Sequence, residues 1–419
     1  MAWQLSIWHL GLKGTGDATI IFAIDGRTTK TVLIDGGHVE DATRILARLS
    51  DIAARHGLTS VPVDVVINTH YDADHLNGLR TLLASNDRRF DHSVIIDQGQ
   101  PGVATVKTKG DGSLNVSYPG RTDDYNRYEN AIKTINTRDR VTEQVIDAGR
   151  FSPSALAAAG YHSLGWLVGK EVMWANWPNP AAATAAPQRP ELTCVAANLR
   201  VLQCDGTTEP IASKVMSAER SANQRSMAFL LRFGGFKYYI GGDIEAVQES
   251  GKDWDADKQQ DPVDESAKSL MLYLNPTDDV PGRVHAMKTS HHGSKYSSSA
   301  KFIQRLRPQL AIISCGPNNK HGHPDQDVVD ELTTCDYYLT GEDLRDGTTA
   351  LTNQATVAGV LLPTGERKAD SDIEIRAVQA NLPNFEAICY RPKANPDTNI
   401  GKSAKFAYQP FSLRSTDFP

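Results

Sequence analysis

The pattern of apolar and polar positions divides the first 85 residues into short strands and two helices. Apolar or alternating runs between Gly-rich turns predict three strands, over residues 4–9, 18–24 and 31–34. Apolar residues at helical spacing predict a helix over residues 41–55. The apolar run 63–67 predicts a buried strand, and a second helix is expected to begin at Leu76.

The middle of the chain has a weaker pattern, and regular signals return after it. Residues from about 100 to 220 contain the Pro/Ala-rich segment 178–190, which cannot form a regular helix or a central strand. We expect an exposed insertion there and a second, acidic one over residues 251–266. Strands and helices are then predicted over residues 227–233, 237–240, 284–289, 301–306, 310–314 and 325–332.

Composition and charge narrow the class of protein. The 419 residues are 40% hydrophobic and 22% charged, which predicts a sizeable core in one large domain with insertions or in two domains. No apolar run reaches eighteen residues and the N-terminus lacks signal-peptide features, so a cytoplasmic protein is expected. Five cysteines without a C-x-x-C pair favour reduced thiols. The net charge of 44 − 50 = −6 does not by itself indicate nucleic-acid binding.

The densest group of candidate ligands directly follows the predicted strand 63–67. His70, Asp72, Asp74 and His75 place two imidazoles and two carboxylates within six residues. Such groups are costly to desolvate together unless a cation holds them. A solvated turn is the alternative, because Asp and His are common in turns. The density favours a metal site.

Three further motifs follow predicted strands or precede a helix. Gly241-Gly242-Asp243 ends the strand 237–240, where a turn is the ordinary explanation. His291 and His292 follow the strand that begins at residue 284, although paired histidines also occur on surfaces. Gly322-His323-Pro324 precedes the helix 325–332, so His323 could lie at a helix N-terminus that favours an anion.

Taken in order, these motifs resemble the metallo-β-lactamase fold, in the variant typical of its ComEC-like hydrolases. The turn 14–18 and Asp35-Gly36-Gly37 match the opening motifs, and Asp72 stands where the usual pattern has a second His. The resemblance covers about residues 3–340 and implies a four-layer αββα sandwich. Periodicity alone supports only an α/β or α+β fold with mixed sheets. We therefore expect a hydrolase domain over 1–345 and a C-terminal extension over 346–419 packed on it.

The resemblance also implies a centre of two divalent metals. His70 and Asp72 would hold one metal, with Asp74, His75 and His291 on the other and Asp243 between them. His292 is the alternative to His291, and Asp35 would orient a ligand His. Asp74 and His323 are the candidate catalytic residues, His323 as a phosphate contact or general acid. The family's usual further His has no clear counterpart; His162 is the candidate by order, but a core or surface His is favoured.

The function implied is a phosphodiesterase or nuclease that uses a hydroxide bridging two divalent metals. Zinc is the first expectation, and the extra oxygen ligand Asp72 makes manganese a rival. The expected partner is a phosphodiester substrate, with nucleic acid as one candidate. An acyl hydrolase of lactamase or thioesterase type and a non-catalytic partner-binding module are the alternatives.

Overall fold

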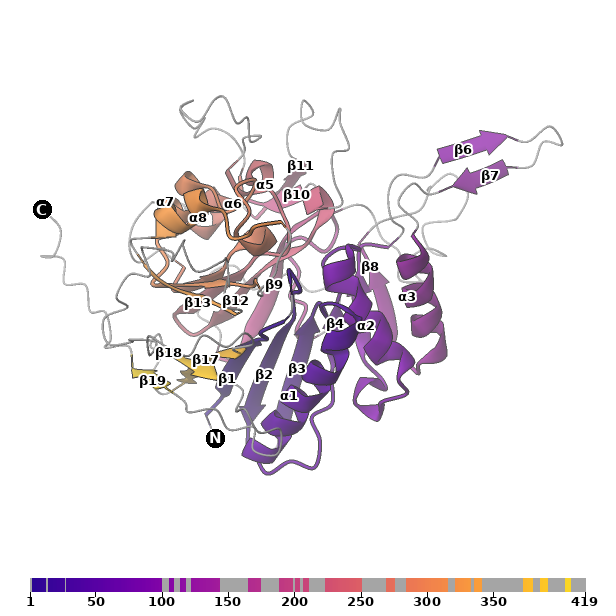
Figure 1. The fold of residues 1–419 in the computed structure, drawn as a ribbon, viewed down its shortest axis with the longest axis horizontal. Helices are drawn as coiled ribbons and strands as arrows, with labels where there is room; N and C mark the ends of the chain where they lie inside the picture. Colours follow the sequence, from indigo (N-terminus) through magenta and orange to yellow (C-terminus); the bar gives the residue numbers. More distant parts are fainter. Residues whose placement is uncertain are drawn as a thin grey trace, which may run out of the picture.

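Two β-sheets form the centre of the protein, and helices lie over their outer faces (Figure 1). The fold is taken from a computed structural model of the chain. The structure describes residues 2–12, 14–26, 28–99, 105–108, 114–117, 122–143, 165–174, 188–198, 200–203, 206–210, 223–250, 269–275, 284–315, 321–332, 335–340, 372–379, 385–390 and 404–407.

The first sheet has the order β19-β18-β17-β1-β2-β3-β4-β5-β8 among the described strands. Its strands are β1 (Gln4–His9), β2 (Thr19–Asp25), β3 (Thr28–Ile34), β4 (Val65–Ile67), β5 (Val94–Asp97), β8 (Asp139–Thr142), β17 (Asp372–Val378), β18 (Phe385–Tyr390) and β19 (Ala404–Ala407). Neighbours from β19 to β3 run antiparallel, whereas β3, β4, β5 and β8 run parallel. The parallel strands β3 and β4 therefore end at the same edge of the sheet, where the loops that follow them can meet.

The second sheet has the order β11-β10-β9-β12-β13-β14-β15-β16 among the described strands. Its strands are β9 (Glu191–Ala197), β10 (Arg200–Leu202), β11 (Thr208–Pro210), β12 (Ala228–Phe233), β13 (Phe236–Ile240), β14 (Ala286–Lys288), β15 (Leu310–Ile313) and β16 (Asp336–Leu339). The strands β13 to β16 are parallel, so this sheet also has an edge where several strands end together. A separate hairpin joins β6 (Thr105–Thr108) to β7 (Leu114–Ser117).

Helices flank both sheets and give the sandwich four layers. Helices α1 (Ala42–Arg55), α2 (Ala73–Ala84) and α3 (Asp123–Thr134) lie beside the first sheet, while α5 (Ala246–Ser250), α6 (Leu270–Leu274), α7 (Ala300–Leu306) and α8 (Gln326–Glu331) lie beside the second (Figure 1). Short 3₁₀ turns occur at Val39–Asp41, Arg88–Phe90, Asn223–Arg225 and Ser290–Gly293.

Alternation along the strands supplies both faces of each sheet with apolar side chains. In β2, Ile21 belongs to the core between the sheets, whereas Ile20 and Phe22 belong to the core under α1. Helix α1 buries one stripe that includes Ile45 and Leu49, at the spacing of an amphipathic helix. This arrangement confirms the mixed α/β fold, with two sheets packed between helices.

Most elements lie where the sequence pattern predicts them, with two differences near the candidate ligands. Helix α2 begins at Ala73 rather than Leu76, which places Asp74 and His75 in its first turn. Helix α8 spans Gln326–Glu331 instead of 325–332, because Asp325 is its N-cap. The acidic segment 251–266 and most of the Pro/Ala-rich segment 178–190 lie outside the described residues.

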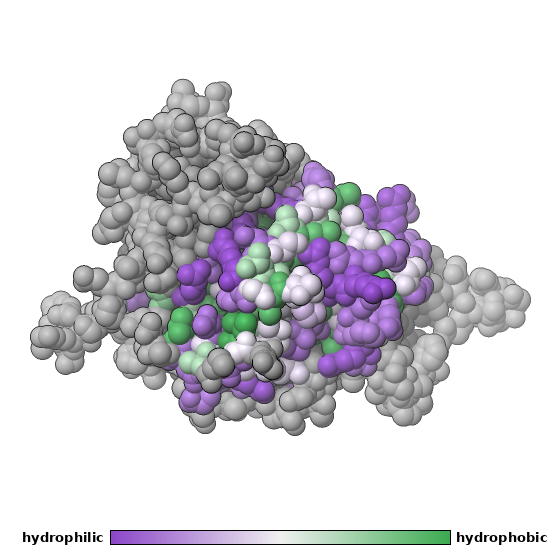
Figure 2. All heavy atoms as spheres, turned by 90° about the horizontal axis from the view of Figure 1, so that it is seen from below, coloured by the Kyte–Doolittle hydropathy of each residue, from purple (hydrophilic) through white to green (hydrophobic). Residues whose placement is uncertain are grey.

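The C-terminal strands continue the first sheet beside β1 (Figure 1). β17 pairs with β1 along its length, and Asp372 at its start accepts hydrogen bonds from Arg44 and from Arg48 of α1. Val39 and Tyr296 are the exposed large hydrophobic residues within the described ranges. Hydrophilic and hydrophobic residues are interspersed on the face shown in Figure 2. In the part of the chain that the structure describes, no helix could cross a membrane.

Candidate metal centre

The first half-site consists of His70, Asp72, Asp74 and His75, between the end of β4 and the first turn of α2. The helix start is held against the loop after β3, because Gly36 N donates to His75 O at 2.8 Å. A Cβ atom on Gly78 would lie 1.7 Å from Gly36 O. Glycine at position 78 therefore allows the helix to approach the sheet closely enough to bury His75 completely.

The second half-site consists of Asp243, His291 and His292, which follow β13 and β14. Position 242 has no room for a side chain, because a Cβ atom on Gly242 would lie 2.4 Å from Ser226 Oγ. That hydroxyl in turn accepts a hydrogen bond from Asp243 N at 2.9 Å. His291 and His292 both adopt left-handed backbone conformations, with φ of 49° and 54°. This conformation is unfavourable for a non-glycine residue and persists only where surrounding contacts enforce it.

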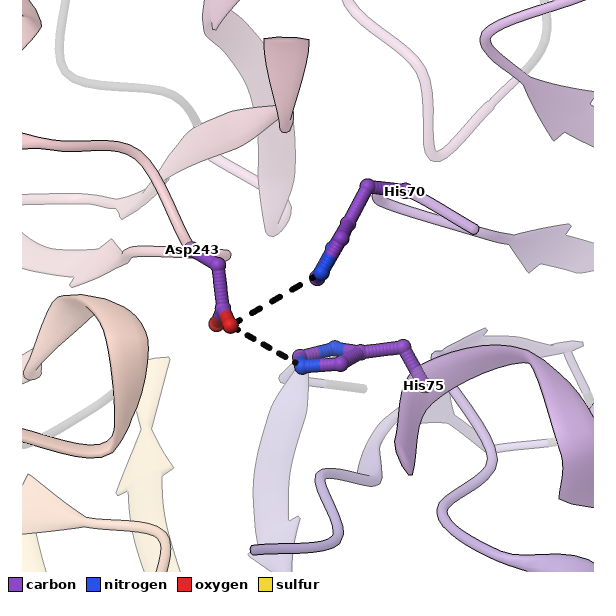
Figure 3. Close-up of side chains that lie close together, drawn as sticks. All are labelled: His70, His75 and Asp243. Carbon is purple, nitrogen blue, oxygen red and sulfur yellow. Dashed lines mark ion pairs between the residues drawn. The ribbon is translucent and has the colours of Figure 1, made fainter. Parts of the chain in front are cut away.

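The two half-sites meet at one carboxylate oxygen. Asp243 Oδ2 lies 3.3 Å from His75 Nε2 and 3.7 Å from His70 Nε2, the two contacts drawn in Figure 3. It also lies 3.6 Å from His292 Nε2 and 3.8 Å from His291 Nε2. Four imidazoles, from segments more than 160 residues apart in the sequence, therefore surround Asp243.

Hydrogen bonds to the opposite ring nitrogens orient these imidazoles. His75 Nδ1 lies 2.8 Å from Asp35 Oδ2, and His292 Nδ1 lies 2.8 Å from the Ser314 carbonyl oxygen. Because both partners are acceptors, each Nδ1 carries a proton and each Nε2 is directed into the site. His70 Nδ1 faces the hydroxyl of Thr69 at 3.1 Å. Asp35, which was expected to orient a ligand His, therefore contacts His75.

Several buried atoms at the centre have no hydrogen-bond partner among the residues that the structure describes. They are His70 Nε2, His75 Nε2, His292 Nε2 and Asp243 Oδ1. Buried polar atoms are nearly always paired, so a convergent group of unpaired nitrogen and oxygen atoms is the donor set that a cation would satisfy. The ligand atoms fall into groups that lie within 4.8 Å of one another: His70, His75 and Asp243 in one group, and Asp74, His75 and His292 in a second. These residues fit a divalent metal.

The neighbouring histidines 291 and 292 occupy different positions. The side chain of His292 is 2% exposed, and its Nε2 lies 3.6 Å from Asp74 Oδ2 as well as from Asp243. The side chain of His291 is 18% exposed, and its Nε2 lies 3.1 Å from Asn223 Nδ2. The alternative His292 is therefore the member of the pair that joins the compact ligand group, while His291 lies at its margin.

The two carboxylates of the first half-site also differ. Asp74 Oδ2 accepts a hydrogen bond from Thr15 Oγ1 at 2.6 Å and faces His292. Asp72, which also caps α2, has a side chain that is 49% exposed and lies 3.7 Å from His70 Nε2. Asp74 is thus fixed in place at the centre, whereas Asp72 lies on the solvent side.

His323 lies beside the centre. Its ring centroid is 5.5 Å from that of His291, and its Nδ1 is 3.3 Å from Asp325 Oδ2. Burial, together with the neighbouring His292 and His291, lowers the pKa of His323 to about 4. The ring is therefore neutral near pH 7. His162 lies outside the described residues.

Charge pairing within the centre opposes the effect of burial. Burial alone would raise the pKa of Asp243, but His75, His292 and His291 hold it well below its usual range. Burial alone would lower the pKa of His75, but Asp243 and Asp35 raise it well above its usual range. The buried cluster thus favours an anionic Asp243 that attracts positive charge.

Four residues of the site were given no individual role in the sequence analysis: Thr15, Asp17, Ser226 and Lys288. Thr15 and Asp17 lie in the Gly-rich turn before β2, and Ser226 lies three residues after Asn223. Each belongs to a segment with a recognisable pattern, but each also contacts a residue distant in the sequence. The sequence therefore indicated the segments and not these contacts.

Comparison with known proteins finds similarity to one protein family and to a curated relative. Residues 14–87 match the family described as the metallo-beta-lactamase superfamily. Over 112 residues the chain is 32% identical to ComE operon protein 3 of Bacillus subtilis (strain 168). The aligned stretch is 27% of this chain but only 12% of that relative, so the chain spans a small part of its length.

Two solved structures are similar at low identity. The metallo-beta-lactamase fold protein YhfI from Bacillus subtilis has a TM-score of 0.35 and 10% identity, covering 82% of this chain and 97% of that protein. The CmlA beta-hydroxylase has a TM-score of 0.28 and 9% identity, covering 74% of this chain and 45% of that protein. The family match and the relative confirm the resemblance found in the sequence. Residues 14–87 of the chain thus match the metallo-beta-lactamase superfamily, a stretch of 112 residues is similar to part of ComE operon protein 3, and the chain has a His/Asp cluster consistent with divalent metal binding.

Proposed function

We propose that the protein is a metal-dependent hydrolase that cleaves phosphodiesters, with nucleic acid as a candidate substrate. The observation that carries the proposal is the convergence of imidazole Nε2 atoms on Asp243 Oδ2 at 3.3 to 3.8 Å. Three of these nitrogens are buried without a hydrogen-bond partner in the described part of the chain. An arrangement of this kind is suited to holding cations and poorly suited to a purely structural role, because the unpaired atoms would destabilise the fold.

We assign the ligands to two ions. His70 and Asp243, with Asp72 beside them, would hold one ion. Asp74, His75 and His292 would hold the other, with Asp243 between the two. His75 offers a single ring nitrogen, since its Nδ1 is engaged by Asp35. The imidazoles favour zinc, and the three carboxylates make manganese the alternative.

Bound divalent metals would supply Lewis acidity, which activates water and neutralises charge on a phosphoryl oxygen. Asp74 is the better candidate for a ligand than for a proton acceptor. Burial opposes ionisation of Asp74, but His292 and His75 lower its pKa below the usual range, and Thr15 occupies one oxygen. A carboxylate held in this way remains ionised and weakly basic.

His291 and His323 are the candidates for contact with the substrate. Both lie at the margin of the centre, with side chains that are 18% and 12% exposed. A neutral His323 can donate or accept a hydrogen bond at a phosphate oxygen, so we assign it to binding rather than to general acid catalysis.

A phosphodiester is favoured over an acyl substrate because the motifs resemble those of ComEC-like hydrolases, relatives that act on nucleic acid or phosphoester head groups. The His-His-Gly-Ser run at 291–294 carries this resemblance. The 32% identity to ComE operon protein 3 supports it.

The proposal can be tested by turnover of bis(p-nitrophenyl) phosphate and of single- and double-stranded DNA and RNA, each with Zn²⁺ or Mn²⁺. We expect metal-dependent cleavage that EDTA abolishes and that the D243N variant lacks. A chromogenic lactam and an acyl thioester are assayed in parallel. Turnover of either of these without any phosphodiester cleavage would contradict the assigned substrate class, while absence of bound metal would contradict the site itself.

A further inference from the structure

We propose that Lys288 and Asp17 form a buried ion pair that positions the second half-site against the first. The inference rests on the proposed function, because the quantity that the pair would control is the spacing of the metal ligands. Asp17 lies within 4.8 Å of Asp35 and His75 in a third group of candidate ligand atoms, but its Oδ2 is engaged by Lys288. Neither Asp17 nor Lys288 is among the ligands assigned above, and neither contributes to chemistry directly. Their role is to hold other residues in place.

Lys288 forms hydrogen bonds with the backbone of the second half-site. It is the last residue of β14, and its side chain is 1% exposed. Its Nζ donates to the carbonyl oxygens of Gly241 at 2.9 Å and Thr289 at 3.1 Å. Gly241 comes two residues before Asp243, and Thr289 comes two residues before His291. One ammonium group therefore joins the ends of both strands from which this half-site projects.

Asp17 forms a backbone hydrogen bond with the first half-site, through Asp74. Its Oδ2 lies 2.5 Å from Lys288 Nζ. Asp17 is therefore the third acceptor for an ammonium group that has three N–H donors. Its backbone N donates to Asp74 O at 3.1 Å, and its carbonyl oxygen accepts from Gly37 N at 2.9 Å. Thr15 in the same turn holds the Asp74 side chain. The pair thus connects the turn that fixes Asp74 with the strands that carry Asp243 and His292.

A purely stabilising role explains this pair poorly. A buried ion pair is often no more stable than apolar residues of similar volume, because desolvation offsets the attraction. The ammonium group, however, joins oxygens from two sheets at defined directions, which apolar packing cannot do. The loop that follows β14 needs such fixed contacts, because His291, His292 and Gly293 all have positive φ. Backbone of this kind needs contacts that enforce it.

The pair also lies within the electrostatic reach of the ligands. Burial raises the pKa of Asp17, but Lys288, His75 and His292 outweigh burial and lower it. An Asp17 left without Lys288 would place an uncompensated negative charge next to two ligand imidazoles. A test must therefore separate the loss of positioning from the loss of charge balance.

The first variant is K288M, measured by competition of the metal-free protein with a chromogenic chelator for Zn²⁺. We expect Zn²⁺ affinity to fall by about 10- to 100-fold, the effect typical of residues that support metal ligands. The matched control is K30M. Lys30 is another largely buried lysine, 10% exposed and 3.4 Å from Asp64, at the opposite end of β3 from the site. K30M should bind Zn²⁺ like the wild type.

The second variant is D17N/K288M, which removes both charges. Thermal unfolding of the metal-free protein should show stability recovered relative to K288M, while Zn²⁺ affinity stays reduced. Recovery of wild-type affinity would show that the pair only balances charge and would overturn the inference, as would a K288M variant indistinguishable from K30M. If K288M does not fold, the double variant supplies the affinity. A wild-type protein that binds no Zn²⁺ would instead contradict the proposed function and remove the basis of the inference.

Discussion

The two half-sites bring similar ligands to one point by different means. In the first, the ligands lie within six residues, and Asp74 and His75 belong to the regular first turn of α2. In the second, Asp243 and the histidine pair follow different strands, and the histidine pair depends on left-handed backbone. The first half-site is thus largely determined by local sequence, and the second by contacts between distant segments. Substitutions outside the ligands should therefore affect the second more strongly.

The largest effect is expected where the half-sites share a ligand. The D243N substitution keeps the shape of the side chain but removes the charge that all four imidazoles face. We expect loss of metal from both positions and a fall in kcat/KM of at least about 10²- to 10³-fold, the scale seen when one essential electrostatic group is removed. Metal content by mass spectrometry and phosphodiester turnover measure the two effects.

The control for D243N is D139N, because Asp139 has an exposed side chain on the first sheet and should change neither quantity. Loss of only one metal from D243N would mean that Asp243 serves one ion. The half-sites would then be independent, contrary to the shared centre that its distances to His70 and His292 indicate.

The next effect distinguishes the two members of the histidine pair. In H292A we expect Zn²⁺ affinity to fall at least about 100-fold, the upper end of the range for supporting residues, since a ligand itself is lost. In H291A affinity should stay within about threefold of the wild type, below that range, while the KM for a phosphodiester rises. Each variant is the matched control of the other. The reverse result would make His291 the ligand.

This pair also marks the limit of what the sequence could predict. The apolar run predicted the strand before His291, and the His-His motif indicated a candidate ligand. The choice between the two histidines depends on backbone angles of 49° and 54°, which direct one ring into the site and the other to its margin. No local pattern encodes that choice, because neighbouring contacts with Ser298 and Gly242 impose it.

The first half-site shows the opposite case. His70, Asp72, Asp74 and His75 were all recognisable from their spacing, and the strand and helix around them lie near their expected positions. The start of α2 was misplaced by three residues, because Asp72 caps the helix through its backbone without a side-chain hydrogen bond. Close packing of Gly78 on Gly36 then decides where the helix begins. Tertiary contact again settles what the local pattern leaves open.

A smaller effect should follow from removing support for the first half-site. Asp35 holds His75 Nδ1 and also accepts from Thr69 N at 2.8 Å. With D35N we expect Zn²⁺ affinity to fall by about 10- to 100-fold, because His75 loses the acceptor that fixes its tautomer. Chelator competition gives the affinity. The control D372N removes another buried carboxylate, which pairs with α1 arginines, and should lower thermal stability without changing affinity.

The smallest effect is expected at Ser226, which touches both half-sites at once. Its hydroxyl accepts from Asp243 N at 2.9 Å and lies 3.4 Å from His70 Nδ1. In S226A one buried N–H loses its partner, at a cost of about 1 to 3 kcal/mol in stability. Affinity for Zn²⁺ should fall less than in D35N, because Thr69 still faces His70.

The matched control for S226A is S93A. Ser93 is also buried, and it donates to Val63 O and Phe90 O at the far end of β5. Both variants should lose stability in thermal unfolding, but only S226A should weaken Zn²⁺ binding. If S226A weakens it more than D35N does, the contact between the half-sites matters more than the tautomer of a single ligand, and the first half-site depends on tertiary contacts as much as the second.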